Sequence, residues 1–186
     1  MEVKSTAAKA AKELAAALEN IQEESINKLV EVVISAKRIY VAGAGRSLLM
    51  LRAVAMRLMH LGFDVYVTGD TTTPAFEEGD LMIIASGSGE TSGLVNIANK
   101  VKNYRGSLAV LTIRGESTLG KMADVCVVIP AFTDKVDDPT LKRPILPGGS
   151  MFEQSVLLLG DTIVLPLAEK MNIPTDRFFS RHANLE

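Results

Sequence analysis

Short apolar runs alternate along this chain with longer stretches in which apolar residues recur every three or four positions. The runs fall at residues 39–42, 63–67, 81–85, 107–113 and 125–129. Runs of this length are typical of strands buried on both faces of a parallel sheet. Helical periodicity at residues 48–61 and 94–104, a short helix ending at Ala123 and a helix from residue 148 to about 171 supply the connections. The pattern predicts an α/β fold, a three-layer sandwich with a five-stranded parallel sheet flanked by helices.

Helical spacing also covers residues 5–36, ahead of the first strand, with Ser25 and Asn27 marking an expected break. The alanine run from Ala7 to Ala17 suits close helix packing, either across the core or against another subunit. We interpret this segment as structural, because it carries no recognisable chemistry.

Two of the strand-to-helix loops combine glycines with hydroxyl side chains. The strand at 81–85 leads into Ser86-Gly-Ser-Gly-Glu-Thr-Ser92, and the strand at 39–42 leads into Gly43-Ala-Gly-Arg-Ser47. Glycines let backbone N–H groups converge, and the following helix adds its unpaired N–H groups and positive dipole end. We therefore predict a phosphate site whose hydroxyl donors are Ser47, Ser86, Ser88 and Thr91, with substrate contacts from Gly45, Arg46, Gly87 and Gly89.

Other readings of these loops are weaker. The Gly-Lys-Ser/Thr of a nucleotide-binding P-loop is missing, and Leu48 occupies the third glycine position of a dinucleotide fingerprint. A capped turn that binds nothing would need one hydroxyl, whereas the serine loop supplies four. Arg46 is either a charge beside the ligand or a surface residue.

The composition of the chain indicates which class of molecule carries the phosphate. A formal net charge of -2 and an isoelectric point near 5.8 argue against a nucleic-acid partner, so the phosphate belongs to a small molecule. The single cysteine, Cys126, sits in an apolar run, where it is expected to pack as a small hydrophobe in a reducing, cytoplasmic setting. No apolar run approaches the length of a membrane span, and the start of the chain does not resemble a targeting segment.

The last third of the chain no longer alternates short apolar runs with helices. Residues 130–147 form a long polar segment that we expect to be a functional loop. The apolar helix that follows begins at Gly148-Gly-Ser-Met-Phe-Glu153, with Ser150 as N-cap and Glu153 at the capping-box position. Glu153 either closes that box or serves as a partly desolvated base.

The two glycine loops and the Gly-Ser-Met-Phe-Glu helix start, in this order and spacing, resemble the sugar isomerase (SIS) domain family. The resemblance extends over the whole length, including the ending Arg181-His-Ala-Asn-Leu-Glu186. It implies one SIS domain over residues 1–186, with N-terminal helices at about residues 1–36 and a flavodoxin-like strand order. It further implies interconversion of D-arabino-hex-3-ulose 6-phosphate and fructose 6-phosphate through a cis-enediol, as in the ribulose monophosphate pathway of formaldehyde fixation. It also implies that the reaction needs no metal or organic cofactor, and that the protein is a homotetramer with active sites near subunit contacts.

The resemblance makes Glu153 the enolisation base. A second acid/base group must move protons between the sugar oxygens, and the chain has two histidines. His60 lies about 20 Å of helix from the Arg46 loop, so it is either a packed residue or one that enters the site of a neighbouring subunit. His182 lies in a polar C-terminal segment that could fold over a site, and we place it ahead of His60.

Three alternatives remain. Another SIS isomerase is possible, although one acting on arabinose 5-phosphate often carries regulatory domains for which this chain has no room. A phosphoheptose isomerase stays open. A non-catalytic sugar-phosphate regulator would need a basic DNA-binding module, which the acidic, alanine-rich first 36 residues lack. A flavodoxin-like redox protein is weaker still, because tryptophan and a flavin loop are missing.

Overall fold

A five-stranded parallel sheet forms the centre of the protein. The computed structural model describes residues 2–134, 142–174 and 180–185. Its strands are β1 (Ile39–Gly43), β2 (Val65–Val67), β3 (Leu81–Ala85), β4 (Ser107–Thr112) and β5 (Val125–Val128), in the order β2-β1-β3-β4-β5. This confirms the predicted three-layer architecture and flavodoxin-like order. The chain reverses its direction of travel across the sheet between β1 and β3, which makes their carboxyl ends the expected ligand position.

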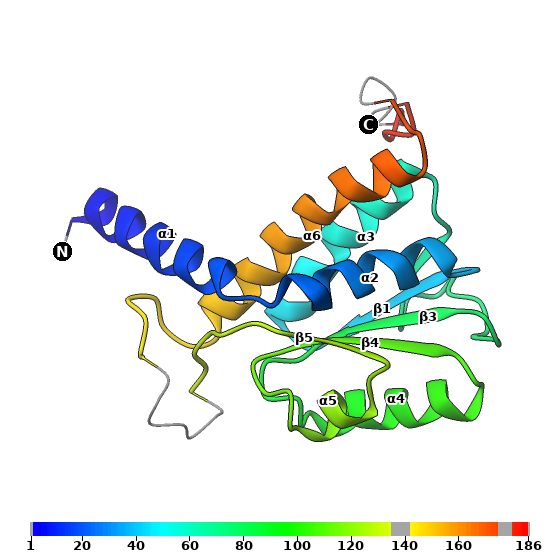
Figure 1. The fold of residues 1–186 in the computed structure, drawn as a ribbon, viewed down its shortest axis with the longest axis horizontal. Coiled ribbons are helices and arrows are strands. Elements are labelled where there is room, and N and C mark those ends of the chain that lie inside the picture. The colour runs from blue at the N-terminus through cyan, green and yellow to red at the C-terminus, as the bar shows by residue number, and fades with distance from the viewer. Residues whose placement is uncertain (1, 135–141, 175–179, 186) are drawn as a thin grey trace.

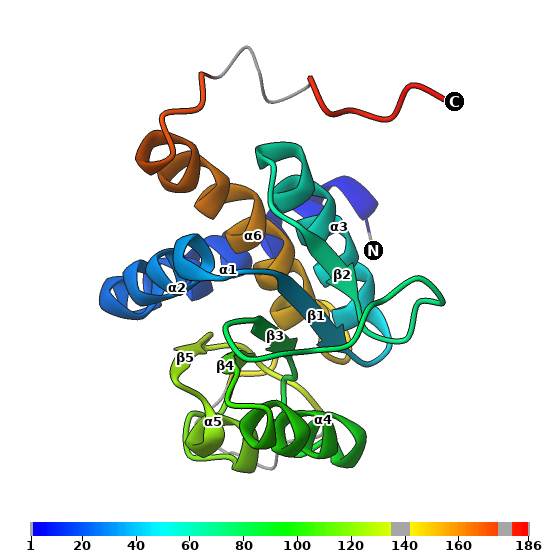
Figure 2. The same ribbon diagram turned by 90° about the vertical axis from the view of Figure 1, so that its right-hand side faces the viewer.

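Helices cover both faces of the sheet (Figures 1 and 2). Helices α2 (Glu23–Ser35), α3 (Arg46–Leu61) and α6 (Ser150–Lys170) lie on one face, and α4 (Ser92–Asn103) and α5 (Thr118–Met122) on the other. Alternate strand residues point to opposite faces, so Ile39 and Val41 join one buried cluster while Tyr40 and Ala42 join the other. Burial on both faces explains why the strands are apolar runs without polar alternation.

The N-terminal helices differ from the expectation in where they break. Helix α1 (Val3–Glu19) ends at Asn20, and α2 begins after Gln22, whereas Ser25 and Asn27 lie inside α2. The break falls earlier because Ile21 turns into the core between the two helices. Helix α1 projects away from the body in Figure 1, and Ala17 is its one buried residue.

Element ends shift by one or two residues elsewhere. Helix α3 begins at Arg46 and α4 at Ser92, each two residues before the predicted start. Strand β2 is only Val65–Val67, because Phe63 and Asp64 belong to the turn after Gly62, whose left-handed conformation ends α3. Strands β4 and β5 each end one residue early. Cys126 on edge strand β5 is only half-buried, and this burial raises the pKa of its thiol.

Helix α6 corrects two expectations. Its N-cap is Gly149 and not Ser150, whose hydroxyl donates to the Pro147 carbonyl, so no capping box forms with Glu153. By length and hydropathy α6 could also cross a membrane, contrary to the expectation from its sequence. It is instead the central packing helix of its layer, with nine buried residues along its length. Such a helix passes a hydropathy test because it is apolar on nearly all sides.

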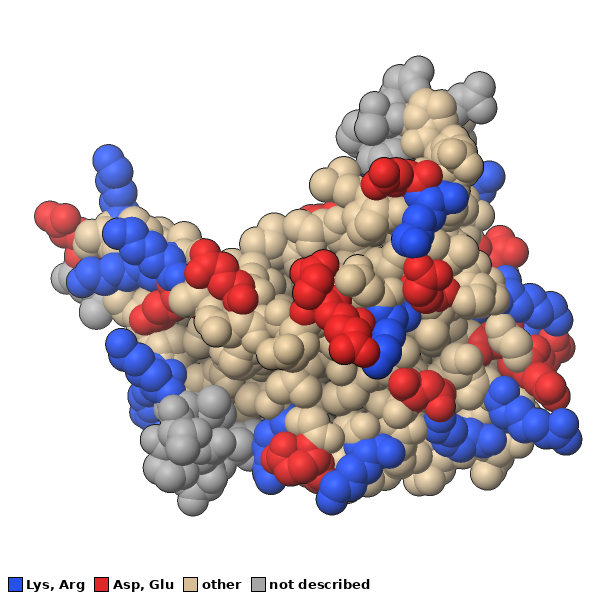
Figure 3. Space-filling model, viewed as in Figure 1, with Lys and Arg blue, Asp and Glu red and all other residues tan. Residues whose placement is uncertain are grey.

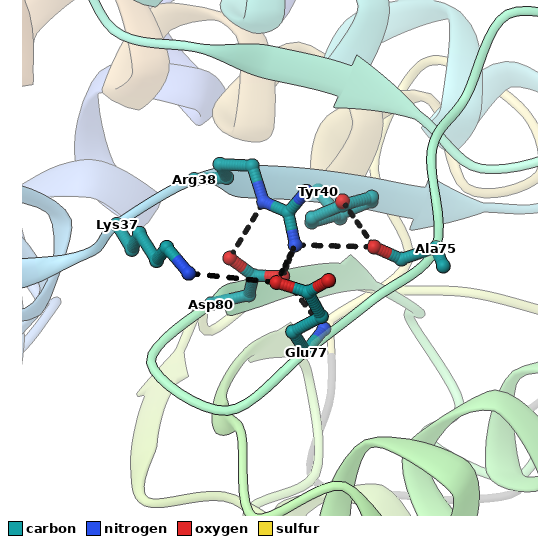
Figure 4. A network of polar contacts seen from close by, with 6 residues as sticks. All are labelled: Lys37, Arg38, Tyr40, Ala75, Glu77 and Asp80. Atoms are coloured by element: carbon teal, nitrogen blue, oxygen red, sulfur yellow. Dashed lines mark hydrogen bonds and ion pairs between the residues drawn. The ribbon is translucent and has the colours of Figure 1, made fainter.

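The amino ends of β1 and β3 carry a closed group of polar residues, which we call the amino-end cluster: Lys37, Arg38, Tyr40, Ala75, Glu77 and Asp80 (Figure 4). Pairing of Ile39 with Leu81 sets Arg38 beside Asp80, and the guanidinium donates to both carboxylate oxygens at 2.9 and 2.7 Å. The Glu77 backbone N–H donates to the same carboxylate at 2.7 Å. Asp80 is fully buried, and its hydrogen bond raises the pKa of Arg38 above the ordinary value. This cluster fastens the loop before β3 to the sheet.

Candidate active site

A cavity of about 240 Å³ opens at the carboxyl ends of β1 and β3. Because Gly43 pairs with Ala85, the two glycine loops start side by side, as the sequence predicts. The start of α6 and the segment after β5 complete the wall. The cavity is lined by Ala44, Gly45, Arg46, Ser47, Ala85, Ser86, Gly87, Ser88, Thr91, Leu94, Thr133, Gly149, Phe152 and Glu153.

Three helices begin at this cavity, and none has a side-chain cap. Their N-cap residues, Gly45 for α3, Thr91 for α4 and Gly149 for α6, all line the wall. The first N–H groups of a helix have no intrahelical partner and carry positive partial charge. Gly45 has φ +57, a conformation that a side chain would strain. The loops therefore leave helix N-termini free to bind an anion instead of capping them.

Hydroxyl groups provide further donors. Ser86 is buried, and its Oγ lies 3.3 Å from Thr91 Oγ1. Ser88 Oγ accepts from the Glu90 backbone N–H at 3.3 Å, which leaves its own hydrogen to donate into the cavity. Ser47 lies in the first turn of α3 and is partly buried. The four hydroxyls predicted for the phosphate site thus line one cavity, whereas Ser92 is exposed outside it.

Gly89 is the one predicted contact that the cavity does not include. Its N–H donates to the Ser86 carbonyl at 3.1 Å, so this donor is used inside the loop. A Cβ at Gly89 would lie 1.9 Å from Ser117 Oγ, and φ is +67. Glycine is needed here for close packing against the start of α5 and a left-handed turn, and the prediction that Gly89 touches substrate does not fit this position.

Glu153 and Arg46 are the two charged residues of the described cavity wall, and they contact each other. Arg46 Nε lies 2.5 Å from Glu153 Oε2, so the start of α3 is joined to the first turn of α6. The Glu153 side chain is 14% exposed, whereas that of Arg46 is 58% exposed. Glu153 Oε1 also lies 3.5 Å from the position that a Cβ on Gly149 would take, so the carboxylate folds back over the helix start. The site therefore holds one sheltered carboxylate, paired with one guanidinium, beside the neutral hydroxyl and backbone donors.

Sequence reasoning missed Thr133, Phe152 and Gly149. Thr133 follows β5 in the predicted functional loop, is buried, and reaches the cavity wall. Phe152 packs under Gly87, with a ring carbon 3.5 Å from the position of a Cβ there. A polar residue at the carboxyl end of β5 was the available signal for Thr133. Residues 135–141 of the same predicted loop lie outside the described residues.

The two histidines lie together, far from the cavity of their own chain. Their rings stack with centroids 5.4 Å apart and planes 25° apart. His60 is near the end of α3, opposite Arg46, and is buried. Burial, His182 and Arg57 lower its pKa. The sequence treats the histidines as alternatives, whereas the fold pairs them. Within the described ranges, no three His, Cys, Asp or Glu side chains gather closely enough to hold a metal ion.

Comparison with known proteins places these features in a family. The SIS domain family model matches residues 33–137. The chain is 44% identical over 166 residues to 3-hexulose-6-phosphate isomerase of Bacillus subtilis, which covers 89% of each chain. It is 39% identical to the enzyme of the same name from Mycobacterium gastri, covering 94% of this chain and 86% of that one.

A solved structure agrees. A Methanococcus jannaschii protein superposes with a TM-score of 0.77 at 32% identity, covering 88% of this chain and 87% of that one. Its structure was reported to infer a molecular function of 3-hexulose-6-phosphate isomerase. The family match includes both glycine loops of the cavity, and the relatives match most of the chain. The chain belongs to the SIS domain family.

Proposed function

We propose that this protein interconverts D-arabino-hex-3-ulose 6-phosphate and fructose 6-phosphate. The observation that carries the proposal is one sheltered carboxylate, Glu153, in the same cavity as three uncapped helix N-termini and four hydroxyl groups. A phosphate requires the donors, and enolisation requires the base. Relatives that match most of the chain carry the name 3-hexulose-6-phosphate isomerase.

The phosphate end of the substrate lies against the glycine loops. Ser86, Ser88 and Thr91 on one loop and Ser47 on the other donate to its oxygens, together with the N–H groups at the starts of α3 and α4. These donors are neutral, so they fix the phosphate without competing for the proton of the base.

The reaction moves a carbonyl between C3 and C2. Glu153 removes the proton from C2 of the 3-ketose, which gives a cis-enediol as electrons move onto the C3 oxygen. The same carboxyl group then delivers the proton to C3, and the carbonyl forms at C2 as the C2 hydroxyl loses its proton. This sequence is redox-neutral and needs no cofactor.

Proton transfer between the C2 and C3 oxygens requires a second group. The stacked pair of His60 and His182 is at the opposite end of α3 from Arg46, about 20 Å away along the helix. In our proposal the pair serves the cavity of a neighbouring copy, with His182, the more exposed ring, facing the substrate.

A homo-oligomer is part of this proposal, with the tetramer as the expected form. Helices α3 and α6 expose Leu49, Met56, Leu158 and Leu165 on the outside of their layer, with Leu165 62% exposed. Much of the hollow between α1 and α6 is uncharged in Figure 3. Met56→Glu should yield smaller particles in light scattering and lose turnover, whereas retention of both size and turnover would remove this face from the contact.

Turnover of different substrates distinguishes two alternative functions from the proposed one. A phosphoheptose isomerase would turn over sedoheptulose 7-phosphate in place of the hexulose, and a non-catalytic regulator would bind sugar phosphates without exchange. Lysine and arginine are interspersed with aspartate and glutamate over the face in Figure 3, so the described residues there form no basic stripe for DNA. The proposal places the enzyme in a reducing cytoplasm, where Cys126 remains a thiol.

Incubation with fructose 6-phosphate in deuterated water tests the proposal. Deuterium should enter fructose 6-phosphate at C3, because this proton is removed when the carbonyl moves from C2 to C3. NMR of the recovered sugar locates the label, and Glu153→Gln protein is the control. Label at C1 would instead indicate aldose formation, and absence of label with intact binding would indicate a sensor.

A further inference from the structure

The contact between Arg46 and Glu153 poses a problem for the reaction. The only charged partner of the base within the described cavity wall is a guanidinium, joined to it through Nε at 2.5 Å. The guanidinium occupies one of the two carboxylate oxygens and holds the side chain in place, so this oxygen is not available to take a proton from the substrate. Efficient proton removal therefore needs this contact to loosen once substrate is present.

We propose that Arg46 restrains Glu153 in the empty site and exchanges it for the substrate phosphate, so that phosphate binding releases the base. This inference rests on the proposed function. Arg46 is then a positioning residue, coupling the non-reacting end of the substrate to the reacting end.

Geometry favours the exchange. Arg46 is the first residue of α3 and stands beside Ser47, a predicted phosphate donor, so its side chain starts at the phosphate end of the cavity. Only Nε of the guanidinium contacts Glu153 in the ion pair, which leaves the Nη groups for a second partner. A phosphate dianion carries more charge than a carboxylate and accepts two parallel hydrogen bonds from arginine.

The exposure of the Arg46 side chain also favours the exchange. The Arg46 side chain is 58% exposed and can swing between partners at little cost, since exposed ion pairs are weak. Arg38 offers the contrast, because its side chain is 18% exposed and donates to both oxygens of Asp80 and to the Ala75 carbonyl. Three bonds fix Arg38, whereas one holds Arg46.

Unphosphorylated fructose with phosphite as a separate dianion isolates the effect. Deuterium exchange at C3 of fructose by the wild-type protein should rise about fivefold as phosphite saturates, the factor expected from releasing one exposed ion pair. Arg46→Gln should exchange fructose about fivefold faster than wild type without phosphite and gain nothing when it is added. Arg52→Gln, which removes an exposed ion pair to Asp70 on the same helix, should behave as wild type.

The phosphorylated substrate gives a second readout that does not depend on slow exchange. With fructose 6-phosphate, Arg46→Gln should raise KM about tenfold and leave kcat nearly unchanged, because the base is already free when substrate is bound. Arg46→Lys, which keeps the charge, should have a KM between those of the wild-type protein and Arg46→Gln.

Two results would overturn the inference. One is slower fructose exchange, or persistent phosphite activation, in Arg46→Gln. The other is a large fall in kcat at unchanged KM, which would mean that the arginine supports the base instead of restraining it. Wild-type protein that does not label fructose 6-phosphate at all would refute the proposed function itself, so the two failures are distinguishable.

Discussion

Strands β1 and β3 carry a polar cluster at each end, and the two clusters differ in how completely their members satisfy one another. At the amino end, Arg38 and Asp80 form two hydrogen bonds, and the buried Asp80 carboxylate also accepts a backbone N–H. At the carboxyl end, one bond joins Arg46 to Glu153, and the neighbouring hydroxyls and helix N-termini face a cavity. The first arrangement stabilises the fold, and the second leaves binding capacity unused.

The starts of the helices show the same difference. Helix α5 faces away from the cavity, and its first turn is closed by Ser117, which accepts from the Gly120 N–H, and by Glu90, which accepts from the Thr118 N–H. Hydrogen bonding from Thr118 lowers the pKa of Glu90. The three helices at the cavity have no such caps. Helices α1 and α2 also have no side-chain cap, so the feature that marks the site is that three uncapped helix starts meet at one cavity.

Among changes at the cavity, Glu153→Gln should have the largest effect on turnover. We expect turnover to fall roughly 10³-fold, because the amide cannot accept the sugar proton, while affinity for fructose 6-phosphate changes little. Steady-state kinetics and calorimetric binding measure the two quantities separately. Full turnover in the variant would remove Glu153 from the chemistry.

Asp80→Ala, in the amino-end cluster, should change stability and leave turnover intact. Loss of a buried carboxylate with three hydrogen bonds should lower the free energy of unfolding by about 3 kcal/mol, and turnover per folded molecule should persist. Urea denaturation measures the first quantity. Asp70→Ala, which removes an exposed partner of Arg52, should cost less than about 1 kcal/mol. Equal costs for both variants would contradict the contrast between a closed cluster and a surface pair.

Ser88→Ala should weaken phosphate binding. Removal of one hydrogen bond to a charged group should raise KM for fructose 6-phosphate about tenfold, with a smaller change in kcat. Ser92→Ala is the matched control, because this hydroxyl belongs to the same loop but does not line the cavity. If the two variants have the same KM, the phosphate does not lie where we propose.

The smallest expected effect concerns His60. Burial, followed by the charges of His182 and Arg57, lowers the pKa of His60 in the folded protein. Between this lowered pKa and the ordinary value near 6.5, the unfolded chain binds the extra proton, so acidification through this window should destabilise the fold. Wild-type Tm should therefore fall more steeply below about pH 6.5 than that of His60→Gln. Parallel Tm curves would mean that His60 titrates alike in both states.

Local patterns in the chain were enough to predict much of this protein. Apolar runs such as Leu81–Ala85 form the expected strands, because a strand buried on both faces must be apolar whatever it packs against. The glycine and serine loops were recognisable because the turns and donors they provide depend on adjacent residues. Of the two roles considered for Glu153 at its helix start, the structure excludes the capping box, and the role as base stays a prediction.

Local patterns in the chain thus predict the layered sheet and the two glycine loops, since each follows from spacing along a few residues, whereas the role of Glu153 as base is a prediction from the family resemblance. Packing in three dimensions brings Arg46 into contact with Glu153, 107 positions away, adds Thr133 to the wall of the cavity and stacks the two histidines on each other. These contacts join residues whose separation in the chain holds no signal, because they arise only when helices pack on a common sheet.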